Sequence, residues 1–550
     1  MKRKNIVILS LGAILSMGIL FGFKNSNNLF EVSKNLEIFN SVFRELNMYY
    51  VDEPEAGKLI KVGIDAILKE LDPYTTYIPE SDIEDYRFMT TGKYGGIGAM
   101  IRKVDSIIFI SEPYSDSPAL KNGLRAGDQL IKVEGKEVAG KTISEVSDLL
   151  KGKAGSEVKI EFKRGSTSQV IQFPREEIKV PDVPFYKMLD TKTGYIKLNR
   201  FTQTASSEVK SAFLDLKEQG MENLVFDLRG NGGGLLMEAV KIVNFFIPTE
   251  KEVVSVRGRV KEFDQIHITK SQPLDTLIPI GVLVNGGTAS ASEIVSGALQ
   301  DYDRAVIIGD NTFGKGLVQN TKDLSYNSKI KLTTAKYYIP SGRCIQRIQY
   351  NNSSNSSNAA ALPDSLLKSF VTMGGRKVID GRGIAPDVEV KDSIPVDLLS
   401  ALYGNSYFFK FINNYTQKIK DPASVQDIEF GEAQFSEFFQ FLKDEKFDYK
   451  SDPEKALADF KKSLEKGDWG SKASTLALEL EKELTEDEWE LIQKHKDLLQ
   501  EILKNELASR YFYQTGRFEA SIANDTDLKK ALSLFANPIE MNTILAPQGK

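Results

Sequence analysis

At 550 residues the chain is too long for one ordinary hydrophobic core, and with 41% hydrophobic and 27% charged residues it has the composition of a folded, multidomain protein. The formal net charge of -5 is small for this length and argues against a nucleic-acid-binding protein. The single cysteine, Cys344, excludes an internal disulfide and a cysteine-rich metal site, and His267 and His495 are the only imidazoles.

The N-terminus has a basic segment followed by an apolar one. Residues 1–4 read MKRK, residues 6–23 carry no charge, and Lys24 ends the run. An uncharged run of this length is at the short end of what crosses a bilayer, and basic residues before it favour export of the chain after it. We therefore expect residues 1–24 to be a signal peptide or a retained membrane anchor. The rest of the protein would then lie outside the inner membrane, on the periplasmic or cell-envelope side.

The next two regions differ in their periodicity. Residues 30–90 repeat apolar side chains at helical spacing and predict a helical region, which ends at LDPYTTYIPE, where prolines favour extended backbone. Residues 93–166 change to short β-type runs that glycine and aspartate turns separate, with one helical run, TISEVSDLLKG, among them. This second pattern predicts a small, mainly β domain.

The larger part of the chain reads as α/β and then as helical. From residue 180 to 392, strand-like runs such as ENLVFDLRG and IPIGVLVNGG alternate with helical runs such as LLMEAVKIVNFFI. This alternation predicts an α/β core with parallel strands and crossover helices, on which we expect residues 70–92 to pack. Residues 405–550 are charged and periodic, and they predict a helical C-terminal region.

A glycine-rich segment at the start of the β region could bind a peptide. Glycines that directly precede an apolar strand can present successive backbone N–H groups to a carboxylate, and the next strand and helix could bind a peptide as an added strand. Together with GLRAGDQLIKVEG, the segment resembles a PDZ domain, and the resemblance implies recognition of a free peptide C-terminus. The candidate carboxylate-binding residues are Tyr94, Gly95, Gly96, Ile97 and Gly98.

Ser290 is the first candidate for chemistry. It lies in TASASEIVSGALQ, directly before a helix that the pattern predicts from about Ala291 to Gln300. A serine at this position is ordinarily a helix N-cap, but Ser292 is also available for that role. A nucleophilic Oγ at residue 290 would lie beside unpaired helix N–H groups, and the next amide, that of Ala291, could stabilise an oxyanion.

Two other segments could complete such a site. The glycines of DLRGNGGG, residues 232–234, let the backbone approach a reacting carbonyl closely, although a plain strand-to-helix turn explains them equally well. Lys315 stands alone in NTFGKGLVQ, where an ordinary surface charge is the simple explanation. In a strand it would share a face with Leu317 and Gln319, whose amide could orient the amine. To act as a general base, Lys315 would need burial to lower its pKa by about two to three pH units from about 10.4.

Other kinds of site find less support in the sequence. Neither His267, in a polar strand-like stretch, nor His495, in a charged helix, lies near a glycine-rich turn, so a Ser-His-Asp triad is not indicated. The glycine spacing fits neither a phosphate-binding loop nor a dinucleotide fingerprint, and no H-x-x-x-H pattern occurs. We therefore expect no metal and no cofactor.

Taken together, residues 30–392 resemble the carboxy-terminal processing (tail-specific) serine peptidases. The segments that carry the resemblance occur in the family order: LDPYTTYIPE, GYIKLNRF, DLRGNGGG, NGGTASASEIVSGALQDYDRAVIIGDNTFGKGLVQ, TTAKYYIPSGRCIQ and GRGIAPDV. The resemblance implies a crotonase/ClpP-like α/β core and a serine–lysine dyad assisted by a glutamine. By position, Ser290 matches the nucleophile, Lys315 the base and Gln319 the orienting residue. The resemblance also implies an oxyanion hole made by the amide of Ala291 and that of Gly233 or Gly234.

The expected function is that of an exported serine endopeptidase whose PDZ domain holds substrate C-terminal tails. Its expected partners are proteins with accessible tails, the membrane through residues 6–23, and an adaptor or a second copy through the C-terminal helices. Two alternatives stay open. One is a catalytically silent PDZ scaffold that binds the C-termini of envelope proteins; the other is an acyl transferase or crotonase-like enzyme, for which the sequence lacks a cofactor motif.

Overall fold

The computed structural model describes residues 29–350, 360–390, 395–466, 470–484 and 488–547. It forms two compact units, one up to Tyr77 and the other from Ile78 onward. The signal or anchor segment expected in residues 1–24 lies outside the described residues. Among the helices that are described, none combines the length and the apolar character needed to cross a membrane.

The first unit is helical, as the apolar spacing predicts. Residues 29–49 form one helix and α2 (Ala56–Lys69) forms another. Many of their large apolar side chains are exposed, among them Leu36, Phe39 and Val62, and within α2 only Leu68 is buried. These two helices therefore bury little apolar surface by themselves.

Residues 93–179 form the predicted small β domain. Five strands pair antiparallel in the order β3-β4-β5-β7-β8 around a buried hydrophobic core, and β2 pairs separately with β9. The last strand of the sheet continues to Pro174, beyond the predicted boundary at residue 166. The elements are β2 (Lys93–Gly96), β3 (Ala99–Val104), β4 (Ile107–Pro113), α4 (Pro118–Lys121), β5 (Gln129–Val133), β6 (Lys136–Glu137), α5 (Ile143–Leu150), β7 (Glu157–Arg164), β8 (Thr167–Pro174) and β9 (Glu176–Lys179).

A six-stranded sheet forms the centre of the second unit. Its order is β10-β11-β12-β15-β16-β23, in which β10 is antiparallel to β11 and all other neighbours are parallel. The inner strands are almost entirely buried, which is typical of a parallel sheet covered on both faces. The predicted α/β core with parallel strands is therefore confirmed. The strands are β10 (Phe185–Met188), β11 (Thr193–Lys197), β12 (Asn223–Asp227), β15 (Ile280–Val284), β16 (Val306–Gly309) and β23 (Val388–Glu389).

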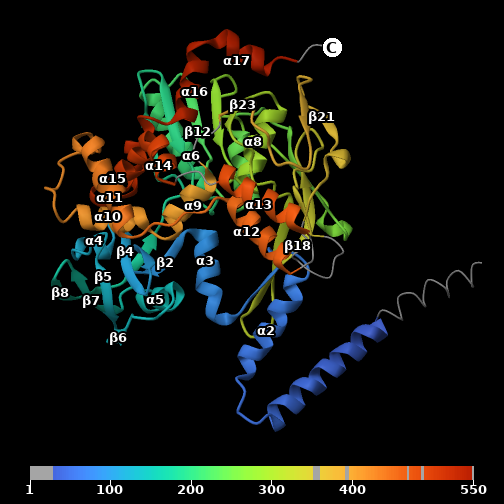
Figure 1. Cartoon of the computed structure of the whole chain (residues 1–550). Coiled ribbons are helices and arrows are strands. Elements are labelled where there is room, and N and C mark those ends of the chain that lie inside the picture. The colour runs from blue at the N-terminus through green and yellow to red at the C-terminus, as the bar shows by residue number, and fades with distance from the viewer. Residues whose placement is uncertain (1–28, 351–359, 391–394, 467–469, 485–487, 548–550) are drawn as a thin grey trace, which may run out of the picture. The chain divides into compact units, whose positions relative to one another are not determined.

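Helices from distant parts of the chain cover the two faces of this sheet (Figure 1). The first face packs against α6 (Ala205–Glu218), α7 (Leu236–Asn244) and α8 (Ala291–Asp301). The other packs against α16 (Thr526–Ala536) and α17 (Pro538–Leu545), coloured red in Figure 1. Because successive side chains of a strand point to opposite faces, Phe226 packs against α6, α7 and α8, and the preceding Val225 packs against α16 and α17.

A second, antiparallel sheet is built from segments that alternate with those of the first. Its strands β17 (Leu317–Asp323), β18 (Lys329–Tyr338), β13 (Glu252–Gly258) and β14 (Gln265–Ile268) pair in that order. The register of β17 on β18 shifts between Val318 and Gln319, so that the strand bends at this point. Shorter pairs are β19 (Ile348–Gln349) with β20 (Ala360–Ala361), and β21 (Ser369–Val371) with β22 (Lys377–Ile379). The helix α3 (Ile83–Thr91) leads into β2.

The C-terminal region is helical, as predicted, and it starts before the expected residue 405. Leu398 and Leu402 of α9 pack into the same apolar cluster as the later helices. The helix α15 contains a kink at Tyr513, whose φ is 56°. The helices are α9 (Val396–Gly404), α10 (Tyr407–Tyr415), α11 (Glu432–Asp444), α12 (Asp452–Glu465), α13 (Gly470–Leu484), α14 (Glu488–Lys494) and α15 (Lys496–Ile522).

The β domain is fixed to this helical region through strand β4. The rings of Phe109 and Phe409 meet edge to face with their centroids 5.5 Å apart. At the end of β4, the buried Glu112 lies 3.6 Å from the guanidinium of Arg517 on α15. The contact between the two domains therefore includes one aromatic pair and one ion pair.

Candidate active site

A cavity of about 450 Å³ brings together all six residues that the sequence assigns to catalysis. The parallel strands β12, β15 and β16 end near one another, and the segments that come directly after them line the cavity. This edge of a parallel sheet is where α/β proteins ordinarily bind ligands. The residues are Ser290, Ala291, Lys315, Gln319, Gly233 and Gly234.

Ser290 has a strained backbone at the start of α8. Its φ of 57° and ψ of -115° lie outside the regions that a serine ordinarily adopts. Strain of this kind needs surrounding structure to hold it and is concentrated at functional sites. Its side chain is partly exposed to the cavity, and the next residue, Ala291, is the first residue of the helix.

The fully buried carboxylate of Glu293 joins the two segments of the site. One of its oxygens accepts hydrogen bonds from the backbone N–H of Ser290, at 2.8 Å, and of Lys315, at 2.9 Å. The other oxygen accepts from the hydroxyl of Thr312, at 2.5 Å, and from the N–H of Gly314, at 2.7 Å. Burial raises the pKa of Glu293 to about 7, against the opposing effect of these four donors. Glu293 therefore sets the distance between the two chain segments that carry Ser290 and Lys315.

The glycine-rich turn approaches Ser290 closely, and buried Asn231 holds it there. A side chain on Gly233 would lie 2.8 Å from the amide nitrogen of Ala291, so only glycine fits without a shift. The N–H of Gly233 donates to the side-chain oxygen of Asn231, at 2.9 Å. The backbone oxygen of Asn231 accepts in turn from the hydroxyl of Ser292, at 2.9 Å. Among the described residues, no hydrogen-bond partner is found for the N–H of Gly234, which leaves this amide available to a ligand.

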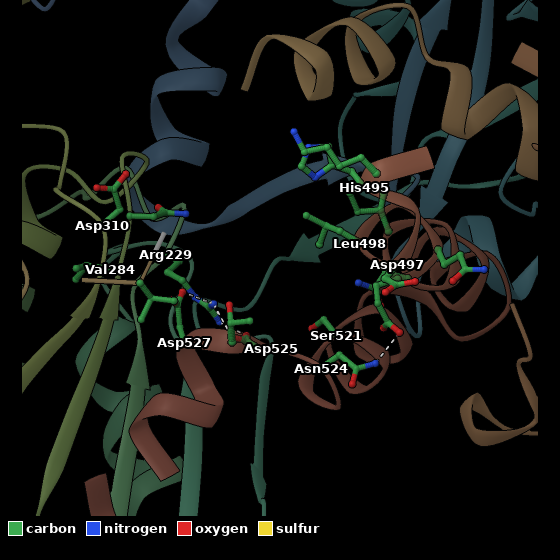
Figure 2. Close-up of a pocket in the computed structure, with 18 residues that line it drawn as sticks. Arg229, Val284, Asp310, His495, Asp497, Leu498, Ser521, Asn524, Asp525 and Asp527 are labelled. Carbon is green, nitrogen blue, oxygen red and sulfur yellow. Dashed lines mark hydrogen bonds and ion pairs between the residues drawn. The ribbon is translucent and has the colours of Figure 1, made fainter. Parts of the chain in front are cut away.

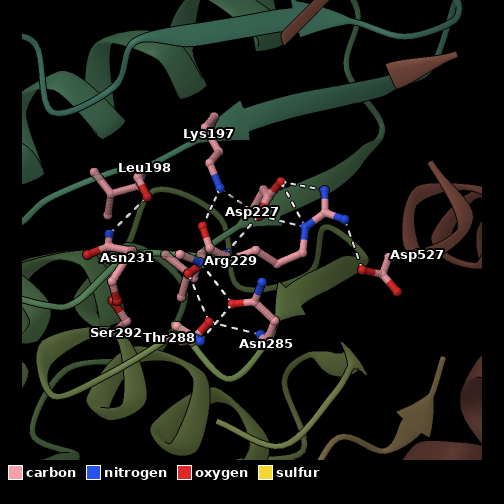
Figure 3. Close-up of polar contacts among 12 residues, drawn as sticks. Lys197, Leu198, Asp227, Arg229, Asn231, Asn285, Thr288, Ser292 and Asp527 are labelled. Carbon is pink, nitrogen blue, oxygen red and sulfur yellow. Dashed lines mark hydrogen bonds and ion pairs between the residues drawn. The ribbon is translucent and has the colours of Figure 1, made fainter. Parts of the chain in front are cut away.

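A buried ionic network supports the start of this turn (Figure 3). The ammonium of Lys197 donates to the carboxylate of Asp227, at 3.0 Å, and to the backbone oxygen of Arg229, at 2.6 Å. Burial alone would raise the pKa of Asp227, but Arg229 and Lys197 together hold it well below its ordinary range. Arg229 also reaches the start of α16, where it pairs with Asp525 at 2.5 Å and with Asp527 at 2.9 Å (Figure 2). The C-terminal helices thus contact the same residue that begins the glycine-rich turn.

Lys315 and Gln319 come from one segment, as predicted, but they are not both in a strand. Lys315 is half-buried in the loop before β17, and Gln319 comes after the register shift inside β17. The amide nitrogen of Gln319 donates to the hydroxyl of Thr333 at 3.1 Å, which fixes the orientation of its side chain. Both residues face the same cavity as Ser290.

Neither histidine lies at this cavity. His267 is on β14, where burial lowers its pKa, and His495 begins α15 beside a different cavity of about 750 Å³ (Figure 2). In the described part of the chain, no three potential ligands among His, Cys, Asp and Glu gather as a metal site would require. The polar side chains that line the cavity include those of Ser290, Lys315 and Gln319.

The predicted carboxylate-binding residues lie partly in a strand. Tyr94, Gly95 and Gly96 belong to β2 and pair with β9, whereas Ile97 and Gly98 form the turn into β3. The ring of Tyr94 meets that of Phe88 edge to face, with centroids 5.1 Å apart. Because Phe88 also lines the cavity that contains Ser290 and Lys315, the two candidate sites share one aromatic contact.

Three residues that the sequence interpretation missed are Asn231, Glu293 and Arg229. For Glu293 a signal was present, because Ser290-Ala-Ser-Glu293 has the S-x-x-E spacing of a capping box, in which the glutamate binds the N-cap amide. For Arg229 no local signal exists, since its partners Asp525 and Asp527 are almost three hundred residues away in the chain. Only the fold brings them together.

Comparison with known proteins identifies three regions of the chain. A model of peptidase family S41 matches residues 192–353, a PDZ-domain model matches residues 109–164, and a model described as "Probable PDZ-protease, C-terminal helical domain" matches residues 398–535. A carboxy-terminal-processing protease of Bartonella bacilliformis is 36% identical over 353 residues, which cover 63% of this chain and 81% of that protein. A probable CtpA-like serine protease of Staphylococcus haemolyticus is 36% identical over 342 residues, which cover 62% of this chain and 68% of that protein.

A solved structure, titled photosystem II D1 C-terminal processing protease, is 28% identical and covers 66% of this chain and 94% of its own, with a TM-score of 0.35. Together with the domain matches, the cavity defines a class: a serine peptidase with a PDZ domain and a C-terminal helical domain. The chain belongs to peptidase family S41, among the carboxy-terminal-processing proteases.

Proposed function

We propose that the protein is an endopeptidase that binds the C-terminal tail of a protein substrate and cleaves it with a serine–lysine site. One observation carries the proposal: a single cavity is lined by a strained serine at a helix N-terminus, a half-buried lysine, and the two residues Ala291 and Gly234 whose amides the proposal uses. Such a set supplies a nucleophile, a base and an oxyanion hole, which are the parts that acyl transfer needs.

In this mechanism neutral Lys315 takes the proton of the Ser290 hydroxyl while the Ser290 oxygen attacks the substrate carbonyl carbon. The N–H groups of Ala291 and Gly234 donate to the oxyanion that forms, and Gly234 is favoured over Gly233 because the latter already donates to Asn231. The resulting ammonium of Lys315 gives its proton to the leaving amine as the peptide bond breaks. A water molecule then hydrolyses the acyl-enzyme by the same route.

The PDZ domain would supply the substrate's position rather than the chemistry. A free C-terminal carboxylate would bind the amides around Ile97 and Gly98, and the tail would lie along β3 as an added strand. The contact between Tyr94 and Phe88 supports this arrangement, because it connects the carboxylate-binding turn to a residue that lines the catalytic cavity. Export across the inner membrane is part of the proposal and is based on the sequence of residues 1–24 alone.

Labelling and cleavage experiments test the serine–lysine site. A serine-reactive acylating probe should label the wild-type protein and a Ser207→Ala control, which removes an exposed serine on α6, but not Ser290→Ala. Lys315→Met should abolish cleavage of a tail-bearing protein substrate and keep the same thermal unfolding midpoint, whereas exposed Lys336→Met should cleave normally. Equal labelling of Ser290→Ala and the wild type would contradict the proposal and favour the silent scaffold.

A further inference from the structure

The charge of the catalytic cavity is one-sided. Its basic lining residues in the described chain are Arg200, Lys315 and Lys331, and none of the described lining residues is an aspartate or a glutamate. Lys315 has a catalytic role in the proposed mechanism. The other two cations have no role in that chemistry, although placing a charge in a partly desolvated wall has a cost that a bound anion would offset.

Lys331 lines the cavity from β18 and lies two residues before Thr333, the residue that pairs with Gln319. In the antiparallel pair of β17 and β18, Thr321 is opposite Lys331 and Gln319 is opposite Thr333. Opposite residues share a face, and residues two apart on a strand repeat that face after about 7 Å. Since Gln319 contacts Thr333 on this face, the side chain of Lys331 lies on the same face, about 7 Å further from Lys315.

Lys331 has no protein counter-ion in the described part of the chain. It is half-buried, burial lowers its pKa, and among the described residues no carboxylate lies within ion-pair distance of its ammonium. Its neighbour Lys329 on the same strand does have such a partner, Asp323. Both lysines are on the same strand, so the strand does not explain why only Lys329 has a carboxylate partner. A ligand that binds the ammonium of Lys331 would explain it.

Arg200 contributes a second positive charge to the cavity lining. Its guanidinium donates to the backbone oxygen of Val180 at 2.9 Å and lies over the ring of Phe88, 5.4 Å from its centroid. These two contacts are with uncharged groups, but Arg200 also interacts electrostatically with the buried carboxylate of Asp182, which does not line the cavity. Among the described residues, Lys331 is therefore the cation of the lining without a carboxylate partner, and Arg200 adds a partly compensated positive charge.

We propose that Lys331, supported by Arg200, forms a subsite that selects an aspartate or glutamate side chain of the substrate close to the scissile bond. An extended peptide advances about 3.3 Å per residue, so the acidic residue would lie about two positions from the residue that contacts Gln319. This inference rests on the proposed function, in which the cavity binds a peptide, and it specifies the class of peptide.

Matched peptides test the subsite by binding. Fluorescent peptides that share the same last four residues, and hence the same PDZ contribution, would carry either Glu or Gln at each position in turn on both sides of the cleaved bond. On the Ser290→Ala protein, one position should bind Glu about three- to tenfold more tightly than Gln, as expected for a partly exposed charge pair. The added change Lys331→Met should remove this preference, and Lys331→Glu should favour Lys over Glu at the same position. The matched control Lys336→Glu, an exposed lysine on the same strand, should keep the preference for Glu.

Binding and cleavage separate the two proposals. If no position distinguishes Glu from Gln, or if Lys331→Met keeps the preference, the subsite proposal is wrong even when the wild-type enzyme cleaves these peptides. If Ser290→Ala still cleaves the peptides, the proposed catalytic site is wrong, and the Glu preference in binding would still report on Lys331. Thermal unfolding midpoints of the Lys331 variants verify that the fold is intact.

Discussion

Ser290 and Lys315 belong to different chain segments, and the carboxylate of Glu293 accepts a hydrogen bond from the backbone of each. A carboxylate has only acceptors, so it can satisfy all four of the donors that surround it. A glutamine at position 293 would have one oxygen and one NH2 group. The NH2 group is a donor, so it could not accept hydrogen bonds from the two donors on its side. The relative position of Ser290 and Lys315 therefore depends on a carboxylate acceptor, which is charged at pH values above about 7.

We accordingly expect Glu293→Gln to lower kcat by about 10- to 100-fold, because small displacements of reacting groups are costly in rate. KM should change little, since Glu293 does not line the cavity in which a peptide would bind. Steady-state cleavage of a peptide substrate measures both constants. The control is Glu238→Gln, which changes a buried glutamate that is not among the residues lining the cavity. An unchanged kcat in Glu293→Gln would show that this carboxylate does not position the dyad.

At the residue scale, the candidate catalytic residues proposed from the sequence all line one cavity, and their roles stay a prediction. The local pattern placed Ser290 at a helix start, whereas Lys315 and Gln319 were assigned their roles by resemblance to the carboxy-terminal processing peptidases. The choice between Gly233 and Gly234 could not be made from the sequence. It depends on which amide Asn231 occupies, and that is a property of the folded turn.

At the scale of elements, the start of α16 is attached to the glycine-rich turn through Arg229. Asp525 also accepts a hydrogen bond from the N–H of Leu528 and so caps the helix. Its replacement by asparagine keeps a good N-cap and removes the charge, which separates the two roles.

For the double variant Asp525→Asn, Asp527→Asn we expect the free energy of unfolding to fall by about 2–4 kcal/mol, since two charged hydrogen-bonding partners of a mostly buried arginine are lost. Cleavage should fall with it, because Arg229 begins the turn that carries Gly234. Chemical denaturation and kcat measure the two effects. Asp497→Asn, which lines the same 750 Å³ cavity from α15, is the matched control and should behave as wild type. If the double variant had the kcat of the wild type, the ion pairs between α16 and Arg229 would not contribute to catalysis.

The contribution of the contact between β4 and α15 to stability should depend on pH, because it contains the buried carboxyl group of Glu112. Burial raises the pKa of Glu112 to about 7, and the nearby Arg517 only partly opposes this effect. A raised pKa means that the folded state holds the proton more tightly than the unfolded state does. Folding therefore loses stability as the pH rises from about 4.5 to about 7, and the penalty is complete above that range.

Glu112→Gln should consequently raise the free energy of unfolding by about 1–3 kcal/mol at about pH 8 and have little effect at about pH 4.5. Thermal unfolding of both proteins at the two pH values measures the difference. Glu137→Gln, on an exposed strand of the same domain, should show no such pH-dependent gain. If Glu112→Gln destabilised the protein at the higher pH, the pairing with Arg517 would outweigh the burial of the charge.

At the scale of the whole molecule, the sequence predicted the order of the regions but not how they share a core. The runs of β12 and β15 are apolar on both faces, which indicates a doubly covered sheet, yet nothing in the sequence says what covers the second face. The structure assigns that role to Leu528, Ala531 and Leu534 of α16. The predicted helical C-terminal region thus supplies the helices that complete the peptidase core.

A chain that stops at residue 524 should therefore be insoluble, because the apolar face formed by Val225, Leu283 and Ile308 would be exposed to water. Deleting residues 452–484, which contain α12 and α13, should leave a soluble protein, since no residue of these helices belongs to the main apolar clusters of the described chain. Expression yield and size-exclusion chromatography compare the two. A soluble, folded chain ending at residue 524 would contradict the role given to α16 and α17.

The same arrangement makes the proposed activity depend on a segment far from the proposed catalytic residues in the chain. The carboxylates that pair with Arg229 and the helices that cover the second face of the sheet come more than 200 residues after Ser290 and Lys315. A chain that has been synthesised through Lys315 but not through α17 still has one face of the central sheet uncovered. We therefore expect proteolysis to begin only after α16 and α17 have been synthesised and have folded against the sheet.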